Sequence, residues 1–136
     1  MPLPEVRFHI YPTDCDMLGH LNHATMLTFL ERARWALLEP QIDTRHWARQ
    51  PVFSVVRHVD IGYFAQSLPG EDLVIRSGLL AVKNTSYIVR QDVRKVGTNE
   101  KVAEASIVFV AIGQDGRPVR VPDNWRQMLP HWPESD

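Results

Sequence analysis

Two carboxylates, two histidines and an asparagine fall within ten residues near the start of the chain: Asp14, Asp16, His20, Asn22 and His23. A carboxylate can take a proton from water or attack a carbonyl carbon directly. The first N–H groups of a helix lack intrahelical acceptors and carry partial positive charge, so they can polarise a carbonyl oxygen. A loop of this composition in front of a helix is therefore suited to the hydrolysis of an acyl compound.

Each of these residues also has an ordinary structural explanation. Aspartate favours turns, and Asp14 is expected to be a hydrogen-bonding loop residue. Asn22 is predicted mainly to cap the following helix, and its place beside a reactive group is the secondary interpretation. His20 can orient Asp16 or a water molecule, or simply pack. The side chain of His23 is expected to face solvent or a ligand.

Two other kinds of site are disfavoured by the sequence. Asp14, Cys15, Asp16, His20 and His23 include usable metal ligands, but no second group of ligands with zinc-like spacing occurs elsewhere. No Gly-x-Ser-x-Gly segment marks a Ser-His-Asp hydrolase. We therefore expect neither a metal nor a cofactor.

A long helix is predicted directly behind this loop. From Ala24 to Leu38 apolar residues recur at helical spacing, and Pro40 ends the pattern. The segment before the loop, Val6 to Tyr11, alternates apolar and polar residues as a strand does. The loop therefore joins a strand to a helix.

Four more strands are expected after a polar connection from Gln41 to Gln50 that contains Ile42 and Trp47: Val52 to Phe64, Leu73 to Val82, Ser86 to Val96 and Val102 to Ile112. Successive hairpins would make the sheet antiparallel. The Pro-rich tail, residues 117–136, is expected to pack loosely with a short turn near residues 125–129. This order predicts one α+β domain over residues 1–136, with a five- or six-stranded antiparallel sheet wrapped around one long helix.

Composition limits the classes of partner. The chain has 136 residues and a formal net charge of −1, which argues against a nucleic-acid-binding protein. No apolar run approaches the ~20 residues of a membrane span. Cys15 is the single cysteine and no secretory signal is evident, so a cytoplasmic location is expected.

The pattern Asp-x-Asp-x-x-Gly-His-x-Asn over residues 14–22, at a junction between loop and helix, resembles the hotdog-fold acyl-CoA thioesterases. The similarity is greatest to the 4-hydroxybenzoyl-CoA thioesterase-like group, and it covers nearly the whole chain. Further segments that carry it are 29–34 (Phe-Leu-Glu-Arg-Ala-Arg), 59–63 (Val-Asp-Ile-Gly-Tyr), 69–72 (Pro-Gly-Glu-Asp) and 117–122 (Arg-Pro-Val-Arg-Val-Pro). The resemblance implies the hotdog fold and hydrolysis of an acyl-CoA to a free acid and CoA.

The resemblance also assigns roles to residues. Asp16 corresponds to the catalytic carboxylate, as general base or nucleophile, and the backbone N–H near His23 to the oxyanion donor. Gly19 matches the loop glycine, and His20 and Asn22 stand where relatives use a histidine and an asparagine. Leu18 replaces a second asparagine of some plant acyl-ACP thioesterases, which leaves Asp16 as the main agent.

Substrate binding is less sharply defined. Tyr63 and Ser86 are candidates to line the thioester site, and Lys83, Arg90, Arg94 and Lys95 are candidates to meet the phosphates of CoA. The resemblance implies a homodimer with sites at its interface, often doubled to a homotetramer. Two alternatives stay open: an acyl-thioester dehydratase that uses His20 with Asp16, and a non-catalytic acyl-CoA-binding module. The acyl group itself is not defined by the sequence.

Overall fold

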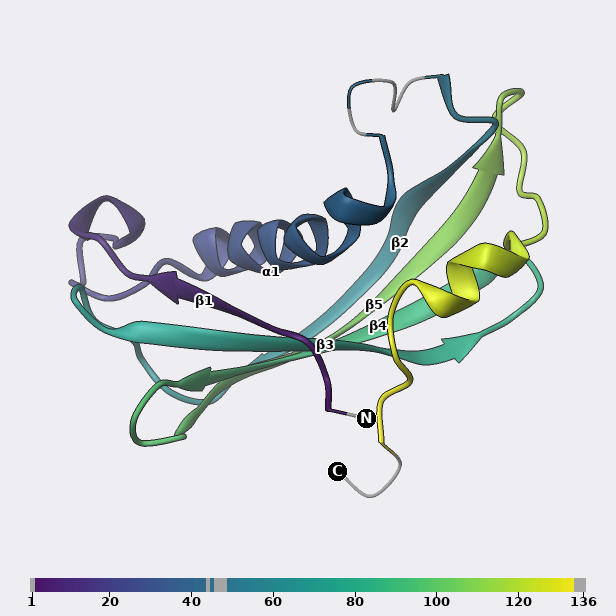
Figure 1. Cartoon of the computed structure of the whole chain (residues 1–136). Coiled ribbons are helices and arrows are strands. Elements are labelled where there is room, and N and C mark those ends of the chain that lie inside the picture. Colours follow the sequence, from purple (N-terminus) through teal and green to yellow (C-terminus); the bar gives the residue numbers. More distant parts are fainter. Residues whose placement is uncertain (1, 44, 46–48, 134–136) are drawn as a thin grey trace.

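One long helix and five strands make up the chain in the computed structural model, which describes residues 2–43, 45 and 49–133 (Figure 1). The helix and the strands begin and end within two residues of the predicted positions, and Trp47 of the predicted connection lies outside the described residues. The elements are β1 (Glu5–His9), η1 (Pro12–Asp14), α1 (His23–Leu38), η2 (Glu39–Gln41), β2 (Val52–Tyr63), β3 (Asp72–Val82), β4 (Ser86–Lys95), β5 (Lys101–Gly113) and η4 (Asp123–Gln127), where η denotes a 3-10 helix.

The strands form a single antiparallel sheet in the order β1-β3-β4-β5-β2. This confirms the predicted α+β class with one five-stranded sheet. The expectation that hairpins join all four later strands is wrong for one connection. Hairpins link β3 to β4 and β4 to β5, but β2 pairs with β5 and β3 pairs with β1, so the chain crosses the sheet between β2 and β3.

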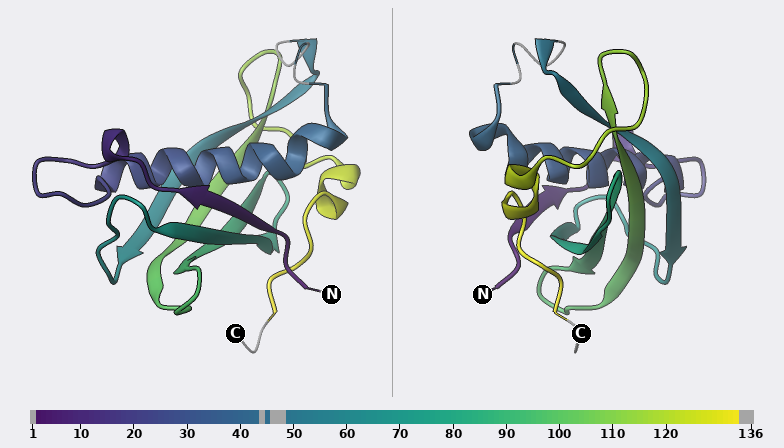
Figure 2. Two further views of the ribbon diagram at one scale, coloured as in Figure 1. Left: turned by 60° about the vertical axis from the view of Figure 1, so that its left-hand side comes forward. Right: turned by 90° about the vertical axis from the view of Figure 1, so that its right-hand side faces the viewer.

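The concave face of the sheet wraps around α1 (Figures 1 and 2). The helix turns one apolar face toward the sheet, carried by Met26, Phe29, Leu30 and Ala33. These side chains pack against alternate residues of the strands, including Ile75, Val89 and Val93. Phe8 of β1 stacks on Phe29, with ring centroids 4.9 Å apart. These core contacts therefore hold α1 against the concave face of the sheet.

The C-terminal tail packs closely, contrary to the expectation from its prolines. Val121, Leu129 and Trp132 are buried. Leu79 of β3 donates its N–H to the carbonyl of Pro130 and accepts from the N–H of Trp132, so the tail lies beside β3 where β1 has ended. Gly78 makes the close approach possible, because a Cβ there would lie 3.3 Å from the Trp132 ring and 2.8 Å from Leu3.

Within the described part of the chain, no helix is both long enough and apolar enough to cross a membrane.

Candidate active site

The acid-bearing loop is a small hairpin whose shape is defined by the backbone. The N–H of Gly19 donates to the carbonyl of Asp16 at 3.0 Å, and the N–H of Asp16 donates to the carbonyl of His20 at 3.1 Å. Cys15 and Leu21 form an antiparallel bridge below this turn. Gly19 has a φ of +84°, a left-handed conformation that glycine adopts without the steric cost other residues incur. The predicted loop glycine is therefore required by the geometry of the turn.

The base of the hairpin is tied to the rest of the molecule. Leu21 donates its N–H to the carbonyl of Ser67 at 2.8 Å, and Asn22 donates its N–H to the carbonyl of Asp14 at 3.1 Å. The Asp14 carboxylate accepts from the N–H of Tyr11 at 2.9 Å. Asp14 is thus a structural loop residue in this arrangement, and Asp16 is presented by a well-braced turn.

Asn22 joins the Asp16 carboxylate to the start of α1. Its side-chain N–H₂ lies 3.5 Å from Asp16 Oδ2, while Asp16 Oδ1 accepts from the N–H of Leu18 at 3.0 Å. Its side-chain oxygen accepts from the N–H groups of Ala24 (2.8 Å) and Thr25 (3.3 Å), which confirms the predicted N-cap. Asp16 is half-buried.

One N–H group of the first helical turn makes no hydrogen bond to Asn22. The N–H groups of Ala24 and Thr25 bind the Asn22 side chain, and the N–H of Met26 binds the Asn22 carbonyl. The N–H of His23 makes no hydrogen bond to any residue that the structure describes. The amide that the sequence singled out is therefore available to an acceptor from outside the chain.

Tyr63, at the end of β2, lies beside this amide. Its hydroxyl donates to the carbonyl of His23 at 2.7 Å, and the two rings meet edge to face at 6.5 Å. Partial burial raises the pKa of the Tyr63 hydroxyl, so it stays a donor at neutral pH. The pKa of the nearby Cys15 thiol is also raised, by burial first and then by Asp14 and Asp16, which disfavours a thiolate. Asp16, Gly19, Asn22, His23 and Tyr63 thus come together at one end of α1.

His20 lies within the hairpin, opposite Asp16, and is half-buried. The described residues contain no group of three or more histidine, cysteine or acidic side chains placed to hold a metal ion.

The remaining predicted binding residues lie elsewhere in the same chain. Lys83 and Ser86 form the β3–β4 turn, where the N–H of Lys83 donates to the carbonyl of Ser86. The eleven residues of β3 separate this turn from the Asp16 end, a distance of about 35 Å. A single chain therefore does not bring Lys83 and Ser86 to Asp16.

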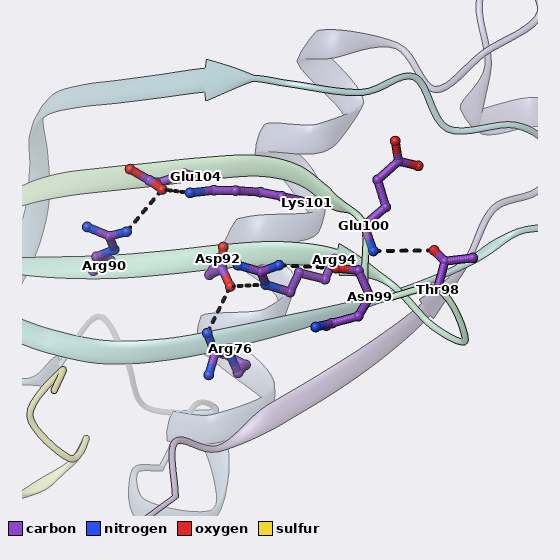
Figure 3. Close-up of polar contacts among 9 residues, drawn as sticks. All are labelled: Arg76, Arg90, Asp92, Arg94, Thr98, Asn99, Glu100, Lys101 and Glu104. Atoms are coloured by element: carbon purple, nitrogen blue, oxygen red, sulfur yellow. Dashed lines mark hydrogen bonds and ion pairs between the residues drawn. The ribbon is translucent and has the colours of Figure 1, made fainter. Parts of the chain in front are cut away.

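Arg90 and Arg94 lie on the face of the sheet that points away from α1 (Figure 3). Arg90 pairs with Glu104 at 3.0 Å, and its guanidinium lies 5.0 Å from the centre of the Trp132 ring. Arg94 pairs with the buried Asp92 at 2.9 Å. Lys95 contacts Glu71 at 3.2 Å. The structure does not bring these cations together with Asp16, so their role in binding CoA stays a prediction.

A cavity of about 510 Å³ lies at the opposite end of α1 from Asp16. It is lined by the C-terminal half of α1 and the residues after it, the start of β2, strands β3, β4 and β5, and the tail around η4. The sequence did not point to it, because its walls come from six separated segments. One signal was present: Arg34 interrupts the apolar face of the helix and lines this cavity.

The two edges of the sheet differ in character. β1 presents Glu5, Arg7 and His9 to solvent, and charged side chains protect an edge from pairing with another sheet. β2 also exposes Arg57, His58 and Asp60, but it differs from β1 in exposing Val55, Val56 and Val59, each at 39–50%. The β2 edge is the one suited to pairing with a second sheet.

Comparisons with known proteins identify the family of this chain. Residues 10–129 match the Thioesterase-like superfamily. The long-chain acyl-CoA thioesterase FadM of Escherichia coli K12 is 32% identical over 97 residues, which are 71% of this chain and 74% of FadM. The crystal structure of YbaW, a probable thioesterase from Escherichia coli, superposes with a TM-score of 0.81 at 26% identity, covering 91% of this chain and 94% of YbaW.

A thioesterase from Thermus thermophilus, solved in complex with coenzyme A and Zn, superposes with a TM-score of 0.78 at 25% identity. That alignment covers 92% of this chain and 90% of the thermophile protein. The hotdog fold implied by the resemblance is therefore confirmed, and the chain belongs to the Thioesterase-like superfamily.

Proposed function

We propose that this protein is an acyl-CoA thioesterase, in which Asp16 and the N–H of His23 act on the same thioester carbonyl. One observation carries the proposal: a single side chain, that of Asn22, contacts the Asp16 carboxylate and caps α1 through Ala24 and Thr25, while the N–H of His23 has no acceptor among the described residues. The names of the relatives agree with this chemistry, since FadM is a long-chain acyl-CoA thioesterase and YbgC of Escherichia coli is an acyl-CoA thioester hydrolase.

The proposed reaction needs an acid–base group and an oxyanion donor. As general base, Asp16 takes a proton from water, whose oxygen bonds to the carbonyl carbon. As nucleophile, it bonds to that carbon itself and forms an anhydride that water then opens. In both routes the C–S bond breaks, and the sulfur of CoA leaves with a proton. The N–H of His23 stabilises the negative charge on the carbonyl oxygen, and such a donor is typically worth ~10²- to 10³-fold in rate.

We further propose that two copies pair through their β2 edges. Antiparallel pairing about a twofold axis would place the Tyr63 end of one β2 beside the Val52 end of the other. The Asp16 loop of one protomer would then face the cavity and the Lys83–Ser86 turn of its partner. This arrangement supports a site shared between protomers, and it gives Lys83 and Ser86 a route to the substrate. A homotetramer and a cytoplasmic location complete the proposal, resting on the resemblance and on the single cysteine.

Substitution of Asp16 tests the catalytic assignment. Asp16→Asn and Asp16→Ala are assayed for CoA release from acetyl-, octanoyl-, palmitoyl- and benzoyl-CoA with a thiol reagent. We expect a loss of at least ~10²-fold in kcat, as for removal of a general base, while Asp14→Asn serves as the matched control and retains most activity. Mass analysis of the products separates release of CoA from loss of water. Turnover by folded Asp16→Asn at the wild-type rate refutes the assigned role.

A charge on the β2 edge tests the proposed pairing. Val55→Glu and Val59→Glu are expected to shift the mass in solution toward the monomer and to lower activity, because like charges would meet at the interface. Val96→Glu, which alters an exposed valine just after β4, is the control. A wild-type protein that is monomeric and fully active contradicts the shared site.

A further inference from the structure

The cavity at the C-terminal end of α1 contains a partly buried arginine. Its wall is largely apolar, with Leu38, Val52, Leu79, Val89 and Leu129 among its residues. Arg34 enters this wall from α1 and Tyr87 from β4. A volume of about 510 Å³ is within the range of sites that hold small organic ligands. A guanidinium in such surroundings needs hydrogen-bond acceptors, and the apolar side chains of the wall do not supply them.

The contacts of Arg34 leave part of its guanidinium unused. Nη1 donates to Oε1 of Gln91 at 3.0 Å, and the group lies 5.2 Å from the centre of the Phe109 ring. No carboxylate of the described residues lies within ion-pairing distance of it. A guanidinium has five N–H donors, so several remain for an acceptor from outside.

The electrostatic surroundings agree with an incompletely compensated charge. Burial lowers the pKa of Arg34, while Glu31 and Tyr87 act in the opposite direction. Glu31 and Asp43 also line the cavity, but both are exposed to solvent, whereas Arg34 is partly buried. Tyr87 and Ser54 bond to each other, so their hydroxyl groups are already partnered. Arg34 is therefore the charged group that a ligand inside the cavity would meet.

From these contacts we infer that the cavity receives the far end of an acyl group that carries an oxygen function there, with a carboxylate preferred. The acyl-CoA of a dicarboxylic acid has this chemistry: one end forms the thioester and the other is an anion. A planar guanidinium matches a carboxylate with two parallel hydrogen bonds. The inference rests on the proposed function, because the thioester end must reach an Asp16, that of the partner in the proposed pairing.

Matched substrates test this inference without any variant. Octanedioyl-CoA and octanoyl-CoA have the same chain length and differ in the terminal carboxylate. We expect the wild-type protein to favour octanedioyl-CoA by about 10- to 100-fold in kcat/KM, the range that a hydrogen bond to a charged group supplies. Equal values for the two substrates, or a preference for octanoyl-CoA, overturn the inference and leave the thioesterase proposal intact.

Variants assign the preference to Arg34. Arg34→Met is expected to remove the preference for octanedioyl-CoA, while Arg32→Met, which alters an exposed arginine of the same helix, keeps it. If Arg34→Met does not fold, Met128→Trp, which fills the cavity from the tail, is expected to lower kcat/KM for octanedioyl-CoA but not for acetyl-CoA. A preference that survives either change overturns the inference.

A binding measurement separates this inference from the catalytic proposal. Free octanedioate is titrated into the wild-type protein and Arg34→Met, with octanoate as the comparison, and heat and thermal stabilisation are recorded. Binding of octanedioate that depends on Arg34 supports the inference even if no acyl-CoA is hydrolysed. Absence of such binding in a protein that hydrolyses octanoyl-CoA rejects it.

Discussion

Asn22 combines two tasks that proteins often divide between residues. Its carbonyl oxygen caps α1, and its N–H₂ group contacts Asp16. The position of the carboxylate is thereby coupled to the position of the first helical amides. A displacement of the carboxylate would displace the amides as well, and the reverse. Substitutions of Asn22 therefore report on both stability and activity.

Two substitutions separate these tasks. Asn22→Ala removes the cap and is expected to lower the free energy of unfolding by about 1 kcal/mol and to abolish most activity. Asn22→Asp keeps a good cap but sets a second carboxylate beside Asp16, where repulsion is on the order of 1 kcal/mol or more. We expect near-normal stability in urea with kcat lowered about tenfold or more. Normal turnover by Asn22→Asp would mean that the contact with Asp16 does not matter.

Gly19 allows a second matched comparison at the residue scale. Gly19 (φ +84°) and Gly116 (φ +81°) both have left-handed backbones with open space where a Cβ would stand. Alanine at either position is therefore expected to cost about 1 kcal/mol of stability through conformation alone. Only Gly19→Ala should also lower CoA release, because only that turn presents Asp16. Equal activity of the two variants would show that the turn tolerates distortion.

At the scale of elements, a buried polar network fixes α1 against the sheet. Gln91 of β4 donates its side-chain N–H₂ to the carbonyl of Leu30 and to the hydroxyl of Ser77, both at 3.0 Å. It accepts from Arg34 at 3.0 Å. Gln91 is fully buried and all of these contacts are internal. The network therefore sets where α1 lies along the sheet, and hence where both of its ends fall.

Removal of this network should be costly. Gln91→Leu removes the partner of the Ser77 hydroxyl and of the Arg34 guanidinium, while the Leu30 carbonyl keeps its bond within the helix. Each unsatisfied buried group costs about 1–3 kcal/mol. We expect the free energy of unfolding in urea to fall by about 3 kcal/mol or more, whereas Gln114→Leu on the surface changes it by less than about 0.5 kcal/mol. A small effect for Gln91→Leu would mean that water replaces the lost contacts.

The elements could be predicted from the sequence, but their pairing could not. Alternation marked each strand and helical spacing marked α1, since these periods are local. The crossing between β2 and β3 joins strands at opposite sides of the sheet, and no local pattern records such pairing. The Asp16 loop could be predicted because its residues are contiguous. The cavity around Arg34 could not, because it forms only when six distant segments meet.

At the scale of the whole molecule, the tail completes the sheet. Its residues around Trp132 run beside β3, and the indole lies near the guanidinium groups of Arg76 and Arg90, at 5.4 and 5.0 Å. Prolines suggested a loose segment because they exclude regular structure. They do not exclude burial, which here depends on the three isolated residues Val121, Leu129 and Trp132.

Trp132→Ala tests how far the tail supports the domain. Loss of a buried indole is expected to lower the free energy of unfolding by about 3–5 kcal/mol, measured in urea. His131→Ala, which alters an exposed neighbour in the same segment, should change it by less than about 0.5 kcal/mol. If both variants are equally stable, the tail is an appendage rather than part of the core.

The hairpin that carries Asp16 has one more consequence. Its form depends on main-chain hydrogen bonds, whereas the side chains of Met17 and Leu18 at its tip are 99% and 78% exposed. These two positions can be exchanged without rebuilding the turn. A library of variants there would present new surfaces within one residue or two of Asp16, the proposed reacting group, which makes the tip a natural place to redesign selectivity while the fold stays intact.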